Sequence, residues 1–171
     1  TDYRKFEAPC VRRHRLLQSG ENVVAGALSL RCSQSEVVVE ADLLDLARQE
    51  AERVCELAAP PGERTYLALG HRTLAEIALA GQDWDRTGAE LRQALGALEG
   101  CEAPLAEWRV YATVAQFRQQ RGHKAEAKRY WTRSAATINR LAESLVEAGE
   151  LRASLLNHPQ VKTILRQAGR G

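Results

Sequence analysis

The chain has 171 residues, of which 44% are hydrophobic and 27% are charged, with only five prolines. This composition is that of a folded protein with a substantial core, and it excludes a disordered chain. The formal net charge is only +2, whereas a protein that binds nucleic acid over most of its surface is usually more basic throughout.

The charge is spread unevenly along the chain. Residues 1–20 hold five basic and two acidic residues, residues 21–120 hold nine and 16, and residues 121–171 hold ten and four. The corresponding net charges of +3, −7 and +6 describe an acidic middle between two basic ends. Such a pattern could guide a charged partner toward one end of the chain.

The four cysteines, the apolar runs and the N-terminus bear on the cellular compartment. The cysteines form no CxxC pair, which argues against a zinc ribbon and predicts reduced thiols in a cytoplasmic protein. No apolar run approaches the ~20 residues that a membrane span needs, and the N-terminus is polar and basic, unlike a signal peptide. Because Met is absent even at position 1, we expect the chain to be a processed product or a piece excised from a longer protein.

The first part of the chain is the hardest to assign. Residues 1–20 form a basic segment with a short predicted helix at 8–18. Residues 23–40 should form the leading helix of a first helix pair, although their valines also permit a strand. The second helix of that pair is predicted at 42–58, with Asp42 as its N-cap. Pro60, Pro61 and Gly62 then separate this pair from the next.

The following helices carry clearer signals. Helices are predicted at 63–80 and 84–99, with Asp83 or Asp85 capping the second of them. Another is predicted at 104–121, where Pro104 suits a helix start. The next helix has one apolar face whose members follow in steps of four and three: Ala127, Trp131, Ser134, Ile138, Leu141 and Leu145.

The C-terminal residues 146–171 are predicted to cap the structure. Pro159 stands near the start of a closing helix, Val161, Ile164 and Leu165 should point inward, and Gly169 should end it. Such a helix would cover the last exposed face of a stack of helices.

A period of 40 residues relates these helices. At this offset Ala75 falls on Ala115, and Gly81 and Gly122 match to within one residue. The second helices show the same match, and a weaker copy lies another 40 residues earlier. The matched positions are Thr87 and Ala127, Leu91 and Trp131, Ala94 and Ser134, and in the earlier copy Ala47, Ala51 and Val54. About three helix pairs therefore fill residues 21–145.

This pattern of small and bulky positions resembles the tetratricopeptide repeat. The long period is similar to the long-repeat arrays at the C-terminus of bacterial signalling ATPases and transcriptional regulators, and residues 138–165 resemble the closing segment of such arrays. The resemblance implies an all-α fold, a right-handed superhelical array of antiparallel helix pairs (an α-solenoid) with a C-terminal capping helix. Two departures from the family are Thr87, where Ala is usual, and the lack of a proline ending either clear repeat.

The family presents its first helices on a concave face that receives a peptide or a partner helix. On this chain the resemblance would place six polar residues there, and each of them also has a plainer interpretation as solvated helix surface. They are Arg72, Glu76, Arg109, Gln116, Gln119 and Gln120. The carboxylate clamp of the chaperone-binding members is missing, because Ala112 occupies one of its positions.

The chain shows no motif of a catalytic, nucleotide-binding or metal site. His123 with Glu126, and Cys10 with His14, are incomplete as metal sites. We therefore expect a non-catalytic module for protein interaction or for regulation of signalling and transcription, without cofactor or metal. Its partner would be a protein or peptide, an effector, or another domain of the same polypeptide, and self-association is left open. The alternative is a helical nucleic-acid-binding protein that uses its basic termini.

Overall fold

The computed structural model describes residues 34–60 and 62–169, in which every regular element is a helix. This confirms the all-α expectation. The predictions for residues 1–33, including the basic segment, the helix at 8–18 and the Cys10 and His14 pair, lie outside the described residues. The chain divides into two compact units, unit 1 (Thr1–Cys101) and unit 2 (Glu102–Gly171).

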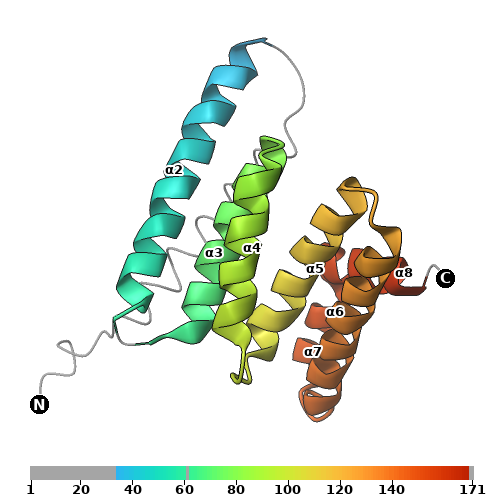
Figure 1. Cartoon of the computed structure of the whole chain (residues 1–171). Helices are drawn as coiled ribbons and strands as arrows, with labels where there is room; N and C mark the ends of the chain where they lie inside the picture. The colour runs from blue at the N-terminus through green and yellow to red at the C-terminus, as the bar shows by residue number, and fades with distance from the viewer. Residues whose placement is uncertain (1–33, 61, 170–171) are drawn as a thin grey trace, which may run out of the picture. The chain divides into compact units, whose positions relative to one another are not determined.

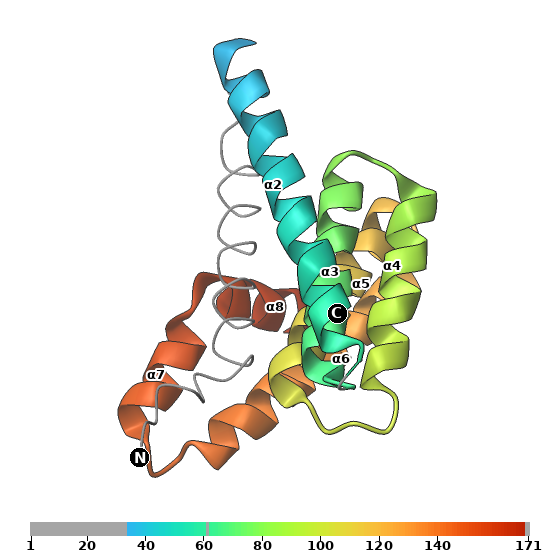
Figure 2. The same ribbon diagram turned by 90° about the vertical axis from the view of Figure 1, so that its left-hand side faces the viewer.

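Unit 1 contains helices α2 (Gln34–Ala58), α3 (Arg64–Ala80) and α4 (Trp84–Leu98), and α3 packs against both of its neighbours. Figure 1 shows the three helices side by side, and Figure 2 shows the same helices after a turn of 90°. The Arg64 side chain at the start of α3 donates hydrogen bonds to the carbonyl oxygens of Gly96, Ala97 and Glu99. A cation at this place satisfies the unpaired carbonyls at the end of α4 and suits the helix dipole.

The prediction for α2 was wrong at its N-terminus. The helix begins at Gln34, so Asp42 lies inside it and is not an N-cap. The strand alternative for residues 34–40 is also wrong. The physical reason is that Val and Asp inside a helix each cost less than about 1 kcal/mol, which is too little to interrupt a helix whose later turns pack against α3.

Unit 2 contains helices α5 (Pro104–Gln120), α6 (Lys124–Ser144), α7 (Gly149–Asn157) and α8 (Pro159–Gly169). The predicted closing helix is confirmed as α8, whose Val161 and Ile164 are almost fully buried. They join one apolar core with Trp108, Trp131 and Ile138. The short α7 has no buried residue, and Leu145 stands as the C-cap of α6.

The α3–α4 and α5–α6 turns are the same turn, 40 residues apart. The amide of Asp83 bonds the Ala78 carbonyl at 2.9 Å, as the amide of His123 bonds the Arg118 carbonyl at 2.8 Å. The middle residue is left-handed in both turns, Gln82 with φ 57° and Gly122 with φ 80°. The turn glycine of the second hairpin therefore corresponds to Gln82. Of the two predicted caps, Asp83 is the N-cap of α4 and accepts from the Arg86 amide.

Burial in α2, α4 and α6 repeats with the same period. Four positions in each helix are at most 7% exposed. They are Ala47, Thr87 and Ala127; Ala51, Leu91 and Trp131; Val54, Ala94 and Ser134; and Ala58, Leu98 and Ile138. The 40-residue match seen in the sequence is therefore a match of packed faces. Thr87, the departure from Ala, is accommodated because its hydroxyl donates to the Asp83 carbonyl at 2.6 Å.

Candidate functional site

Two of the six predicted partner-binding residues form an ion pair inside α3. Arg72 Nη2 lies 2.7 Å from Glu76 Oε1, and the two side chains are only 5% and 14% exposed. A pair so far removed from water stabilises the fold only while it stays complete, because removal of one partner leaves a buried charge. Arg72 and Glu76 therefore contribute little accessible surface.

The other four residues belong to α5. The Arg109 guanidinium lies 4.4 Å from the centre of the Trp108 ring, and its Nη1 donates to the Leu105 carbonyl at 2.6 Å. Gln116 and Gln120 are exposed and stand one helical turn apart on the same side of α5. Gln119 is exposed as well, but its Oε1 accepts from Trp131 Nε1 at 3.2 Å, so it ties α5 to α6.

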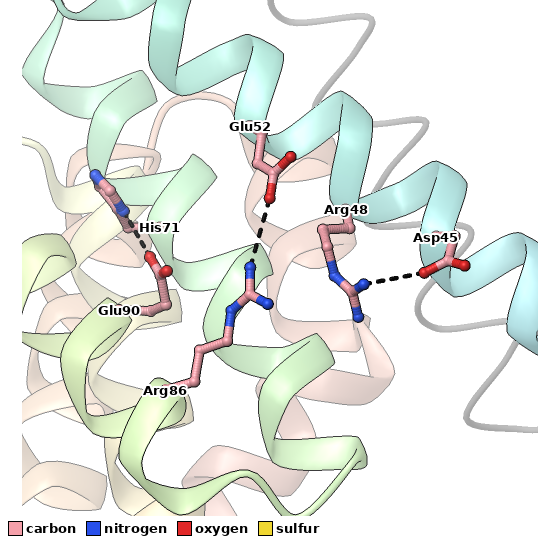
Figure 3. A network of polar contacts seen from close by, with 6 residues as sticks. All are labelled: Asp45, Arg48, Glu52, His71, Arg86 and Glu90. Carbon is pink, nitrogen blue, oxygen red and sulfur yellow. Dashed lines mark hydrogen bonds and ion pairs between the residues drawn. The ribbon is translucent and has the colours of Figure 1, made fainter.

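A histidine–carboxylate pair that the sequence reading missed connects α3 and α4. His71 Nδ1 lies 2.8 Å from Glu90 Oε2, and the side chains are 23% and 18% exposed (Figure 3). On the same side of unit 1, Arg86 of α4 reaches Glu52 of α2 at 3.4 Å. The 19-residue separation of His71 and Glu90 gives no local sequence signal, so only the packing of the two helices shows the pair.

Cys55 lies against this region, and its surroundings suppress its reactivity. A Cβ placed on Gly70 would be 2.6 Å from Cys55 Sγ, so the thiol sits directly on the backbone of α3. Burial, followed by the negative charges of Glu90, Glu52 and Glu56, raises the pKa of Cys55 to about 12. Because the thiolate is the nucleophile, the combination of Cys55, His71 and Glu90 lacks the ionised sulfur that nucleophilic catalysis requires.

A second polar cluster joins α5 and α6 in unit 2. The Arg133 guanidinium lies 4.3 Å from the Tyr111 ring centre and 5.7 Å from that of Tyr130. Its Nη2 donates to the Tyr111 hydroxyl at 3.0 Å. The two rings are 6.1 Å apart and inclined at 44°. At the 40-residue offset these residues correspond to His71, Glu90 and Gln93 of unit 1, which is the signal that could have found them.

The sequence also offered His123 and Glu126 as half of a metal site. His123 Nδ1 is 4.0 Å from Glu126 Oε1, and Glu126 also pairs with Arg118 at 3.3 Å. Within residues 34–60 and 62–169, no three His, Cys, Asp or Glu side chains come together in a way that could hold a metal ion. No helix in the described part of the chain combines the length and the apolar character that a membrane crossing requires.

The chain matches no protein-family model, no curated protein and no solved structure. The assignment of the candidate site therefore depends on the contacts described above.

Proposed function

We propose that the chain is a non-catalytic, tetratricopeptide-like interaction module that binds a peptide or a partner domain along α5. It would serve in the cytoplasm as part of a larger bacterial signalling or transcriptional regulator. The observation that carries this proposal is the pair of exposed amide side chains of Gln116 and Gln120, one turn apart on α5. An amide offers both a donor and an acceptor, which is the complement of a peptide backbone.

The predicted residues take different parts in this proposal. Gln116 and Gln120 make the first contacts. Arg109, two helical turns before Gln116, adds a cation that is held over Trp108. Gln119 contributes its amide nitrogen while its oxygen accepts from Trp131. Arg72 and Glu76 of unit 1 act mainly through each other, since both are largely buried. The raised pKa of Cys55 supports the non-catalytic part of the proposal.

The test is the selection of binding peptides from a random library against the complete chain. The affinity of the selected peptides is then measured for the wild type and for the double variant Gln116→Ala/Gln120→Ala. Two hydrogen bonds of about 1 kcal/mol each are lost in this variant, so we expect the affinity to fall at least about tenfold.

The matched control is Gln49→Ala/Gln93→Ala, which removes two exposed amides from α2 and α4. The control should bind the selected peptides as the wild type does. Equal affinities of the wild type and the α5 double variant would contradict the proposal, and so would a library that yields no binding peptide.

A further inference from the structure

The outer face of α6 carries basic side chains that the fold does not neutralise. Lys124, Lys128, Arg129 and Arg133 are all exposed. Among the residues that the structure describes, none of these four forms an ion pair, in contrast to five arginines elsewhere. The paired arginines are Arg48 with Asp45, Arg72 with Glu76, Arg86 with Glu52, Arg118 with Glu126 and Arg140 with Glu107.

These cations do not serve the helix itself. Lys124 is the first residue of α6 and Lys128 stands one turn later. Positive charge near a helix N-terminus opposes the helix dipole, which favours anions there. The helix thus gains nothing from its two lysines at this end.

Arg133 is held in place by two tyrosines. Its guanidinium lies over the Tyr111 ring, and one N–H donates to the Tyr111 hydroxyl. A guanidinium has five N–H donors in a rigid fork, so most of them remain for a carboxylate. Because the tyrosines already restrict the side chain, binding a partner costs less conformational entropy.

The equivalent positions of unit 1 carry different side chains. His71 and Glu90 form a pair at 2.8 Å where unit 2 has Tyr111 and Tyr130. Unit 1 has the uncharged Gln93 where unit 2 has Arg133, so the cation at this place is a feature of unit 2. The Arg133 side chain contacts Tyr111 and Tyr130.

The four cations form two rows along α6. At about 100° per residue, Lys124 and Lys128 form one row and Arg129 and Arg133 the other, and the two rows lie about 140° apart on the two flanks of the exposed side of the helix. Between the rows lie the small exposed residues Ala125, Thr132 and Ala136. Cations one turn apart are spaced by about 6 Å along the axis, close to the ~7 Å between alternate side chains of an extended peptide.

We propose that this basic face of α6, formed by Lys124, Lys128, Arg129 and Arg133 with Tyr111 and Tyr130, binds an extended acidic peptide segment through its alternating carboxylates. Charge complementarity supplies the attraction, and the Arg133 fork supplies a bidentate contact. A nucleic acid fits less well, because Arg133 occupies the faces of the aromatic rings on which bases would stack. The site includes none of the α5 residues Arg109, Gln116, Gln119 and Gln120, and it does not depend on the function proposed for them.

The experiment uses the complete chain and a fluorescent peptide of about ten residues in which Glu alternates with Ser. Binding is followed by fluorescence anisotropy in about 150 mM NaCl, with a Gln–Ser peptide as the uncharged control. We expect binding of the Glu–Ser peptide only, and a loss of at least about tenfold in the variant Lys128→Glu/Arg133→Glu.

The matched control is Arg152→Glu/Lys162→Glu, which changes the net charge equally at exposed residues of α7 and α8. This variant should keep most of the affinity. The variant Arg133→Lys keeps the charge but loses the fork, so it should bind at least about threefold more weakly. Amide chemical shifts of the wild-type protein should change along residues 124–133 when the peptide is added, a measurement that needs no variant.

Several results would overturn the proposal. One is an equal loss of affinity in the two charge-reversal variants, which would reduce the binding to net charge. Another is tighter binding of single-stranded DNA than of the Glu–Ser peptide with the same dependence on Lys128 and Arg133, which would assign the face to nucleic acid. A stable dimer that the α6 variant abolishes would assign it to a second copy of the chain.

Discussion

At the scale of single residues, the contact between Cys55 and Gly70 connects local packing with chemistry. The thiol lies where any side chain at position 70 would be, and burial together with three nearby glutamates raises its pKa to about 12. An ordinary thiol, such as that of the unfolded chain, has a pKa near 9.0. The difference between the two states makes both the reactivity and the stability depend on pH.

The first prediction concerns alkaline pH. Between pH 9.0 and about 12 the unfolded chain releases the Cys55 proton while the folded chain retains it. The unfolded state then binds fewer protons, so the free energy of unfolding falls as pH rises through this range and is unaffected by Cys55 below it. The measurement is urea unfolding of a variant in which Cys55 is the one cysteine left, compared with the same variant carrying Cys55→Ala. The difference between their free energies of unfolding should change progressively above pH 9.0. Parallel pH profiles would contradict the raised pKa.

The second prediction uses two glycines. Gly70→Ala would place a Cβ 2.6 Å from Cys55 Sγ and 3.3 Å from the Ala51 carbonyl oxygen, so we expect a loss of about 1–3 kcal/mol in urea unfolding. Gly96→Ala meets nothing within 4 Å and should stabilise α4 by about 0.5–1 kcal/mol. Combining Gly70→Ala with Cys55→Ala should restore part of the loss. If both glycine variants unfold alike, the close approach at position 70 is not a constraint.

At the scale of helices, the parts that the sequence predicted are those with local causes. Three predicted helix starts agree with the structure: Asp83 for α4, Pro104 for α5 and Pro159 for α8. Asp42 carried a similar signal but lies inside α2, because an Asp inside a helix costs little when packing continues. A residue of the capping type therefore marks the start of a helix only where the residues before it form a turn that ends the preceding helix.

The candidate site was harder to predict because its contacts connect different helices. The burial of Arg72, the His71–Glu90 pair and the bond from Trp131 to Gln119 depend on which faces meet. Residues 12 or 19 positions apart, such as those pairs, have no fixed relation in a sequence. The repeat offset relates Tyr111 and Arg133 to His71 and Gln93 of unit 1, but it does not predict that the two residues are in contact.

The third prediction tests the role of α8 as a cover for α6. Ile164 is 1% exposed and lies in the core that contains Trp131 and Ile138. Ile164→Ala removes buried methyl groups and leaves a cavity, so the free energy of unfolding should fall by about 2–5 kcal/mol. Leu151→Ala is the control, because Leu151 on α7 is 62% exposed. Denaturation followed by tryptophan fluorescence reports both, and an equal effect of the two variants would show that α8 contributes no core.

At the scale of the whole molecule, the small net charge is the sum of a negative and a positive part of the chain. Residues 34–101 hold 13 acidic and six basic residues, a net charge of −7, and residues 102–169 hold six and 11, a net charge of +5. Opposite charges on separate parts of one chain allow two copies to attract each other even when each has no net charge. Net repulsion between copies is weakest near the isoelectric point of about 8.4.

The fourth prediction follows from this asymmetry. At pH 8.4 and about 0.01 M salt, static light scattering should show net attraction between copies, because the screening length is then about 30 Å. Raising the salt to about 0.15 M shortens that length to about 8 Å and should abolish most of the attraction. The variant Lys128→Glu/Arg133→Glu lowers the positive charge of residues 102–169 and should reduce the attraction at low salt. An apolar contact between copies would instead persist or strengthen as the salt concentration rises. Attraction that does not depend on salt would therefore mean that the copies associate through apolar surface. The exposed Leu105, Val146 and Leu151 would then be the first residues to substitute.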